Sequence, residues 1–293
     1  MSVTLTAARG PHWREKLAYL AYQIRRSPLT MAGLTISLIV LLCMIFAPWL
    51  ASHDPNALDL AARLMPPSAE HWFGTDEVGR DLFSRVLFGS QQSVGVGLFV
   101  AFASCFIGGL LGCFSGVIGG RFDALIMRLM DIMLSVPSLV LIMALAAALG
   151  ASLFNAMLAI TLVRIPSYVR LARGQALSIR QMGYVKAAQT FGAGRWHMVH
   201  WHVARNAMPP LLVQLSLDIG SAILMASALG FIGLGAQQPT AEWGAMVATG
   251  RNYILDNWWY STFPGLAILI TATGFNLLGD GVRDLLDPRQ QGK

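Results

Sequence analysis

Charged residues are scarce in this chain. Only 12% of its 293 residues are Asp, Glu, Lys or Arg, whereas 55% are hydrophobic. A soluble domain carries roughly twice that share of charge, and one soluble core cannot hide so much apolar surface. The composition therefore excludes a conventional soluble enzyme. It predicts an all-α integral membrane protein in which lipid is the solvent for much of the surface.

Cysteine and catalytic motifs are scarce as well. The three cysteines lie in apolar runs without C-x-x-C spacing, at Cys43, Cys105 and Cys113. Neither a disulfide framework nor a cysteine zinc site is expected from them. The sequence has no G-x-x-x-x-G-K-[ST] phosphate-binding loop, no G-x-S-x-G and no H-E-x-x-H. We therefore expect no enzyme activity, and no cofactor bound by this chain itself.

Six long apolar runs predict six transmembrane helices. Each has about 17 to 27 residues, which at a rise of about 1.5 Å per residue suits a hydrocarbon layer of about 30 Å. The runs are Leu29–Ala51, Ser93–Val117, Ala124–Gly150, Leu153–Leu171, Pro209–Leu234 and Phe263–Gly279. We expect the first run to be a retained anchor rather than a cleaved signal, because it is long and ends near the interfacial Trp49.

Charge asymmetry between the loops predicts the orientation. Residues 1–28 carry five basic residues and one acid, and residues 172–208 carry five basic residues and no acid. The loop between the first two runs carries six acids against three arginines. Because basic residues collect on the cytoplasmic side, we expect both termini and the 172–208 loop to be cytoplasmic. The net charge of +6 then reflects topology, and no nucleic-acid partner is expected.

Charged side chains are few inside the apolar runs, and four of them are singled out, namely Arg128, Asp131, Arg164 and Asp218. Each costs about 2.5–3.5 kcal/mol to insert, so each should face protein or water. Arg128 and Asp131 are three residues apart and can pair on one helix face. Asp218 has no partner nearby in the sequence, and Arg164 can either reach it across the bundle or snorkel to the interface. Two interpretations stay open: structural ion pairs, or separate charges offered to a zwitterionic solute.

Glycine and proline interrupt the apolar runs. Gly108, Gly109 and Gly112 cluster in the second run, and Pro137 and Pro166 lie in the third and fourth. Small residues let membrane helices approach closely, and proline permits kinks. Ordinary bundle packing is the simpler interpretation of these residues, and a hinge for a gating motion is the alternative.

The basic segment from about residue 178 to 205 has a helical pattern in two parts. A stretch of small residues ends at Gly192 and Gly194, and Trp196, Val199 and Val203 follow at helical spacing. This pattern predicts a short helix, a turn and a second short helix. Two interpretations stay open. The segment is either a basic helix lying on the anionic inner leaflet or a rigid knob that docks into a groove of a soluble partner.

Three histidines in this segment raise the question of a metal site. His197, His200 and His202 have no cysteine or acid in the segment to complete a ligand set. A structural or catalytic zinc site needs three or four such ligands. We therefore expect no metal there.

The segment from about residue 178 to 205 also resembles a known sequence motif. Ala187-Ala188, then Gly192 after three residues, then a short helix are similar to the coupling segment, often called the EAA loop, of inner-membrane permease subunits of binding-protein-dependent ABC importers. Further motifs resemble the dipeptide, oligopeptide and nickel branch, namely His71–Asp81, Met127–Asp131, Gly233–Gly235, Pro239–Gly244 and Asn276–Pro288. Two positions depart from the family pattern. Lys186 stands where Glu is usual, and Ala204-Arg205 stands where Leu-Pro is common.

The resemblance implies a type I ABC importer permease fold, with a five-helix core plus an N-terminal helix. Residues 1–88 would hold the tail, the first helix and the periplasmic loop. Residues 89–288 would form the permease domain, and 289–293 a C-terminal tail. In the bacterial inner membrane, this subunit would pair with a second homologous permease. Two cytoplasmic ATPase subunits would bind ATP and Mg²⁺, and a periplasmic solute-binding protein would deliver the solute.

The resemblance also implies roles for particular residues. The ATPase-coupling loop would contain Lys186, Ala187, Ala188, Phe191, Gly192, Ala193 and Trp196. Candidates for contact with the binding protein, or for a gate, are Asp76, Arg80, Asp81, Glu242 and Trp243. The solute would be a short peptide, and within the branch the chain resembles permeases assigned to D,D-dipeptides. A permease for nickel or another small solute is one alternative, and an ATP-independent secondary carrier or channel is another.

Overall fold

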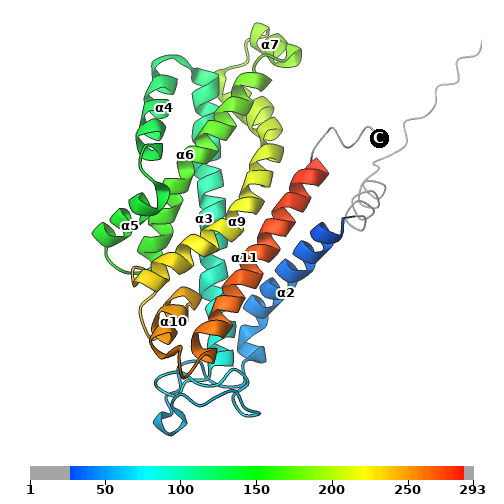
Figure 1. Cartoon of the computed structure of the whole chain (residues 1–293). Coiled ribbons are helices and arrows are strands. Elements are labelled where there is room, and N and C mark those ends of the chain that lie inside the picture. The colour runs from blue at the N-terminus through cyan, green and yellow to red at the C-terminus, as the bar shows by residue number, and fades with distance from the viewer. Residues whose placement is uncertain (1–26, 287–293) are drawn as a thin grey trace, which may run out of the picture.

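The structure, a computed structural model, describes residues 27–286 as a bundle of helices, and that part of the chain contains no β-strand (Figure 1). Most of the predicted basic N-terminal tail and the predicted C-terminal tail, 289–293, lie outside the described residues. The long helices are α2 (Pro28–Leu50), α3 (Leu82–Ile118), α4 (Gly120–Leu134), α5 (Ser138–Leu149), α6 (Leu153–Ile179), α9 (Arg205–Ile232) and α11 (Trp259–Leu286). The shorter elements are η1 (Leu60–Ala62), α7 (Gly183–Thr190), α8 (Arg195–His197), η2 (Met198–Ala204), α10 (Trp243–Gly250) and η3 (Arg251–Tyr253).

Four helices of the described chain are long and apolar enough to cross a membrane. They are α2, α3, α11, and α9 taken together with the turns before it from Arg195. The α4–α5 pair makes a fifth if its two bent halves count as one span. The fourth predicted run, Leu153–Leu171, lies in helix α6, which carries Arg164, Arg170 and Arg173 and is not among these candidate spans. An integral membrane protein is thus confirmed, whereas the number six is not.

The predicted single helix Ala124–Gly150 is wrong in one respect. The chain forms α4 and α5 instead, and their axes meet at an angle of 92°. Pro137, at the start of α5, has an extended ψ of 127°. Proline cannot donate the backbone hydrogen bond that would continue α4, and it disfavours the α conformation of the residue before it. The proline predicted to permit a kink therefore breaks this span.

Glycines let α3 run through the middle of the bundle against α6. A Cβ atom at Gly112 would lie 2.4 Å from the backbone oxygen of Val169, and one at Gly116 would lie 2.6 Å from the Ala176 side chain. Gly108 meets α6 in the same way, one turn earlier. These distances are too short for any side chain, so close packing explains the glycines without a hinge.

Figure 1 shows that the bundle has two distinct ends. The α7–α8 turn lies at one end. The loop between α2 and α3 and helix α10 lie together at the other. Helix α2 runs beside α11 in the antiparallel sense, and Gly33 of α2 contacts the α11 backbone at Leu277 and Leu278. The predicted inward and outward loops thus lie at opposite ends, as the charge pattern requires.

Candidate coupling loop and intramembrane charges

The predicted helix-turn-helix is present between α6 and α9. Helix α7 ends at Thr190, the chain turns at Phe191 and Gly192, and α8 begins at Arg195. Gly192 has a φ of +87°. The Ala193 N–H donates to the Ala188 carbonyl and the Gly192 N–H to the Gln189 carbonyl, both at 3.0 Å. This is a Schellman motif, which ends a helix with glycine in the left-handed conformation.

One side of this loop is held firmly by the bundle. Val185, Met198, Val199 and Val203 are buried. They belong to one apolar cluster with residues of α3 and α6, including Tyr168. Because a buried apolar cluster resists deformation, a force applied to the loop would be transmitted to α3 and α6.

The opposite side of the loop faces solvent. Phe191 is 90% exposed and Trp196 is 74% exposed. The Trp196 ring leans edge-on against Phe114 of α3, with ring centroids 4.7 Å apart. Lys186 and Ala187 are also exposed, while Ala188 and Ala193 are partly buried. The seven residues predicted for ATPase coupling thus gather around one exposed tip, although contact with a partner stays a prediction.

Arg164 and Asp218 meet across the bundle. The Arg164 Nη1 atom of α6 lies 3.7 Å from Asp218 Oδ1 of α9, and Arg164 Nη2 donates to Ser221 Oγ at 2.9 Å. Gln214 Nε2 donates to the same Asp218 oxygen at 3.2 Å. Of the two alternatives left open for Arg164, the structure shows the one in which its side chain reaches Asp218 across the bundle. Among the described residues, the buried Asp218 Oδ2 atom has no hydrogen-bond partner.

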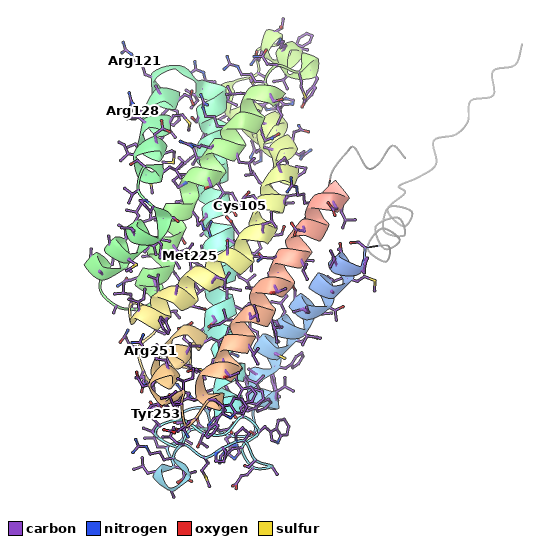
Figure 2. The ribbon with its side chains drawn as sticks, viewed as in Figure 1. Cys105, Arg121, Arg128, Met225, Arg251 and Tyr253 are labelled. Carbon is purple, nitrogen blue, oxygen red and sulfur yellow. The ribbon has the colours of Figure 1, made fainter. Side chains whose placement is uncertain are left out.

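The predicted pair of Arg128 with Asp131 is wrong. Asp131 Oδ1 instead accepts from Arg170 Nη2 of α6 at 2.6 Å. Arg128 is exposed and, in residues 27–286, forms no ion pair within 4.0 Å. Figure 2 shows Arg121 and Arg128 projecting from α4 near the end of the bundle that holds α7. The neighbouring helix α6 presents an arginine to Asp131 in better geometry than the local residue does.

A second α4–α6 ion pair was not predicted. Asp123 Oδ1 accepts from Arg173 Nε at 2.5 Å and its Oδ2 accepts from Arg173 Nη2 at 2.7 Å, a bidentate arrangement. Ser115 of α3 also donates to Asp123. Arg173 holds the carboxylate in the geometry that strengthens charge-assisted bonds. The two residues are 50 positions apart, so no spacing rule could have identified the pair.

The candidate residues Asp76 and Arg80 lie at the opposite end of the bundle. Arg80 Nε donates to Asp76 Oδ2 at 2.6 Å, and Arg85 of α3 lies 3.5 Å from the same oxygen. Glu77 accepts from Arg80 and from the Tyr260 hydroxyl of α11. Asp76 and Arg80 are buried. The contact of Asp76 with Arg85 ties the loop to α3, and that of Glu77 with Tyr260 ties it to α11. Direct contact with another protein stays a prediction.

Glu242 and Trp243 join helix α10 to helix α3. Glu242 caps α10 by accepting from the Gly244 and Ala245 N–H groups, both at 2.8 Å, and Ser93 of α3 donates to it at 3.1 Å. Trp243 donates its indole N–H to a carbonyl of α3 at 2.9 Å. Both side chains are buried. Burial raises the pKa of Glu242, and the three hydrogen bonds lower it in part.

Asp81 is also buried, and it starts α3. Its Oδ2 atom accepts from the Ser84 N–H at 2.8 Å, the usual geometry of an aspartate N-cap. This cap explains why α3 begins at Leu82, earlier than the apolar run predicted. Asp81 also contacts His53 and His71. His71 begins one of the motifs that resemble the family, but neither histidine was expected to form a site.

The chain matches known transport proteins over most of its length. Residues 108–292 match the family described as the inner membrane component of binding-protein-dependent transport systems. Residues 17–67 match the N-terminal transmembrane domain of oligopeptide transport permease C.

Individual relatives agree with these matches. The chain is 72% identical over 276 residues to the "Probable D,D-dipeptide transport system permease protein DdpC" of Escherichia coli, covering 94% of this chain and 93% of that protein. It is 45% identical to the di/tripeptide transport system permease protein DppC of Pseudomonas aeruginosa, over 88% of each chain. It is 44% identical to the dipeptide transport system permease protein DppC of E. coli, over 92% of this chain and 91% of that one. The chain therefore belongs to the family of inner membrane components of binding-protein-dependent transport systems.

Proposed function

We propose that this chain is one of two permease subunits of an ATP-driven importer and forms half of a path for short peptides, D,D-dipeptides in particular. The peptide class is supported by the names of the relatives, and the D,D-dipeptide by the relative at 72% identity. The coupling to ATP is supported by one geometric observation. An exposed aromatic tip, Phe191 and Trp196, stands on a base that is buried in the bundle.

The ATPase subunits would supply the binding sites for ATP and Mg²⁺. In this proposal, two cytoplasmic ATPase subunits bind ATP and Mg²⁺, and a groove on one of them receives Phe191 and Trp196. The buried base, including Val185 and Val203, would make the loop move with α3 and α6 as one body. A rigid-body shift of this kind can switch a path between inward and outward access. A periplasmic binding protein would deliver the peptide at the end that holds α10.

The Arg164–Asp218 pair is the candidate for contact with the solute. A dipeptide is zwitterionic, so it offers one group of each sign. The buried Asp218 keeps one carboxylate oxygen without a hydrogen bond among the described residues, so this oxygen could accept from a solute ammonium group once a shift of the helices opens the path to it. An Asp218→Asn variant is therefore expected to lower peptide uptake. Assembly, uptake and stimulated ATPase activity all at the wild-type level would reject this role.

A Phe191→Ala variant tests the coupling. Phe191 is 90% exposed, so its truncation should leave the fold and the membrane insertion unchanged while it removes a docking contact. The assembled complex in proteoliposomes, supplied with its binding protein and labelled D-alanyl-D-alanine, should lose at least about tenfold in ATP-dependent uptake, as for an interface hot spot of about 1.4 kcal/mol or more.

Phe154→Ala is the matched control. Phe154 is also exposed, at 60%. It lies at the N-terminal end of α6, whereas the coupling loop follows the C-terminal end of that helix, so truncation of Phe154 should leave uptake intact. Unchanged uptake in Phe191→Ala, or uptake by wild type without ATP, would contradict the proposal. Either result would favour the ATP-independent carrier instead.

A further inference from the structure

Two histidines and an aspartate converge at the end of the bundle opposite the coupling loop. His53 follows the end of α2, His71 lies in the loop between α2 and α3, and Asp81 caps the start of α3. His71 Nδ1 lies 3.0 Å from Asp81 Oδ1, and His53 Nδ1 lies 3.9 Å from Asp81 Oδ2. One ligand atom from each of the three residues lies within 4.8 Å of the other two.

These residue types and distances suit a small divalent cation. Zinc takes histidine nitrogen and carboxylate oxygen at about 2.0–2.2 Å, which places neighbouring tetrahedral ligands roughly 3.4 Å apart. The His71–Asp81 and His53–Asp81 distances of 3.0 and 3.9 Å lie on either side of that value. Small rotations of the two imidazole rings would therefore bring all three ligand atoms to bonding distance of one ion.

The neighbouring residues fix the position of Asp81 and leave the site open to an ion on the side of His53. The Asp81 side chain is 1% exposed, the His71 side chain 13% and the His53 side chain 38%. Asp81 is also fixed by its bond from the Ser84 N–H. His53 lines an open depression together with Pro48 and Phe88, among others. An ion could enter past His53, and a water molecule could complete its coordination, as in open zinc sites.

Without a metal, the same groups form a hydrogen-bonded chain. The carboxylate can only accept, so His71 Nδ1–H donates to it, and Ser52 Oγ donates to its other oxygen at 3.4 Å. His53 Nδ1 lies 3.0 Å from Ser52 Oγ. With a metal bound, each imidazole would carry its proton on Nε2, so that both Nδ1 atoms could bond to the ion together with Asp81, and Asp81 Oδ2 could still accept from the Ser84 N–H. The site can therefore exist in both forms without refolding.

We propose that His53, His71 and Asp81 bind a zinc-class divalent cation that ties the end of α2 and the following loop to the start of α3. This proposal is independent of the proposed peptide transport. The residues lie at sequence separations of 18 and 10, so an ion would close two loops at once. An ion that binds the folded chain and not the unfolded chain stabilises the fold by mass action.

Metal binding to the full-length protein tests the proposal. The purified chain, freed of metal with a chelator, should bind one equivalent of Zn²⁺ by calorimetry and should melt at a higher temperature once loaded. Co²⁺ should bind in the same place and give visible absorption bands, whose intensity reports a low coordination number. Zn²⁺ should displace the Co²⁺ signal.

Substitutions identify the ligands. His53→Gln, His71→Gln and Asp81→Asn should each weaken Zn²⁺ binding at least about a hundredfold, because loss of even an outer-shell partner costs about 10- to 100-fold. Asp81→Asn keeps the helix cap, since asparagine caps as well as aspartate, so it removes the ligand charge without removing the start of α3. Melting of each variant without metal checks that it folds.

His200→Gln is the matched control, because His200 is an exposed histidine outside the cluster. Its affinity for Zn²⁺ should equal that of the wild type. No Zn²⁺ binding by the wild type would overturn the proposal. Equal binding in the His53, His71 and Asp81 variants, or loss of binding in His200→Gln alone, would overturn it as well and would indicate a plain hydrogen-bonded cap.

Discussion

At the scale of single residues, Gly112 shows how little room separates α3 from α6. An alanine Cβ there would lie 2.4 Å from the Val169 oxygen and 2.7 Å from the Ala172 side chain. The helices would have to separate, so we expect Gly112→Ala to lower the free energy of unfolding by about 1–3 kcal/mol, as for other overpacked sites. Thermal unfolding in detergent measures the change.

Gly174 provides the comparison for Gly112. It lies within α6, but a Cβ atom there would meet nothing within 4 Å. Gly174→Ala should therefore raise the unfolding free energy by about 0.4–1 kcal/mol, because alanine restricts the unfolded chain and favours a helix. Equal effects of the two substitutions would contradict the packing argument.

Glu242 gives a prediction about pH. Burial raises the pKa of its carboxyl group in the folded protein above the ordinary value. Between the unfolded and the folded pKa, the folded state binds more protons, so stability falls as the pH rises through this window. The stabilisation that comes from the raised pKa of Glu242 is fully present below the pKa in the unfolded chain, which is about 4.3 for glutamate.

Unfolding measured from acid to neutral pH, in wild type and in Glu242→Gln, tests this. The glutamine cannot ionise, so the stability of wild type relative to the variant should decrease as the pH rises. All other titrating groups are shared by the two proteins and cancel in the difference. A constant difference would show that the hydrogen bonds from Gly244, Ala245 and Ser93 offset the burial, and a difference that grows with pH would show that they outweigh it.

At the scale of elements, the Arg164–Asp218 pair joins α6 to α9. Removing either partner leaves the other charge partly buried, which is costly. We expect Arg164→Gln and Asp218→Asn to be coupled by about 0.5–3 kcal/mol in a double-mutant cycle of unfolding, because residues in direct contact are not additive.

A second cycle with Arg128→Gln and Asp218→Asn serves as control. Arg128 is exposed on α4, and the two residues share no contact in the described structure. Their effects should add to within about 0.5 kcal/mol. Additivity in the first cycle would mean that the 3.7 Å separation between Arg164 and Asp218 contributes nothing to stability.

The break between α4 and α5 also belongs to this scale. In Figure 1, α4 lies along α6, whereas α5 turns away from the direction of α4. Asp123 and Asp131 of α4 both pair with arginines of α6. These pairs neutralise arginines that would otherwise make α6 expensive to bury in a membrane. A polar helix such as α6 can therefore belong to the bundle although its own sequence is a weak membrane signal.

At the scale of the whole molecule, the two ends of the bundle must face opposite sides of the membrane. We expect the loop with Arg63 to be periplasmic and the loop with His200 to be cytoplasmic, because the basic residues gather in the latter. Both residues are exposed. Single cysteines at these two positions, in a chain whose native cysteines are replaced by alanine, report the orientation.

A membrane-impermeant maleimide should label Arg63→Cys in intact spheroplasts and His200→Cys only in inverted vesicles. Labelling after detergent treatment provides the control for reactivity, since both thiols should then react. The reverse pattern would invert the topology. Labelling of both cysteines from one side would contradict the assignment of the two loops to opposite faces.

The sequence alone predicts the features that depend on neighbouring residues. Apolar runs predicted the membrane helices, and small residues with Gly192 predicted the helix-turn-helix that the structure contains. These signals are local because helix formation and membrane insertion depend on segments of about 20 residues. The motifs in the same segments indicate the transport family without reference to any tertiary contact.

Only the tertiary structure decided which distant residues meet. Asp131 pairs with Arg170 instead of its neighbour Arg128, and His53 and His71 gather around Asp81. The apolar pattern likewise could not give the 92° angle between α4 and α5, because it is the same on both sides of a break. Ion pairs and ligand sets depend on distances of a few ångströms between groups that packing brings together. Composition and spacing along the chain do not contain those distances.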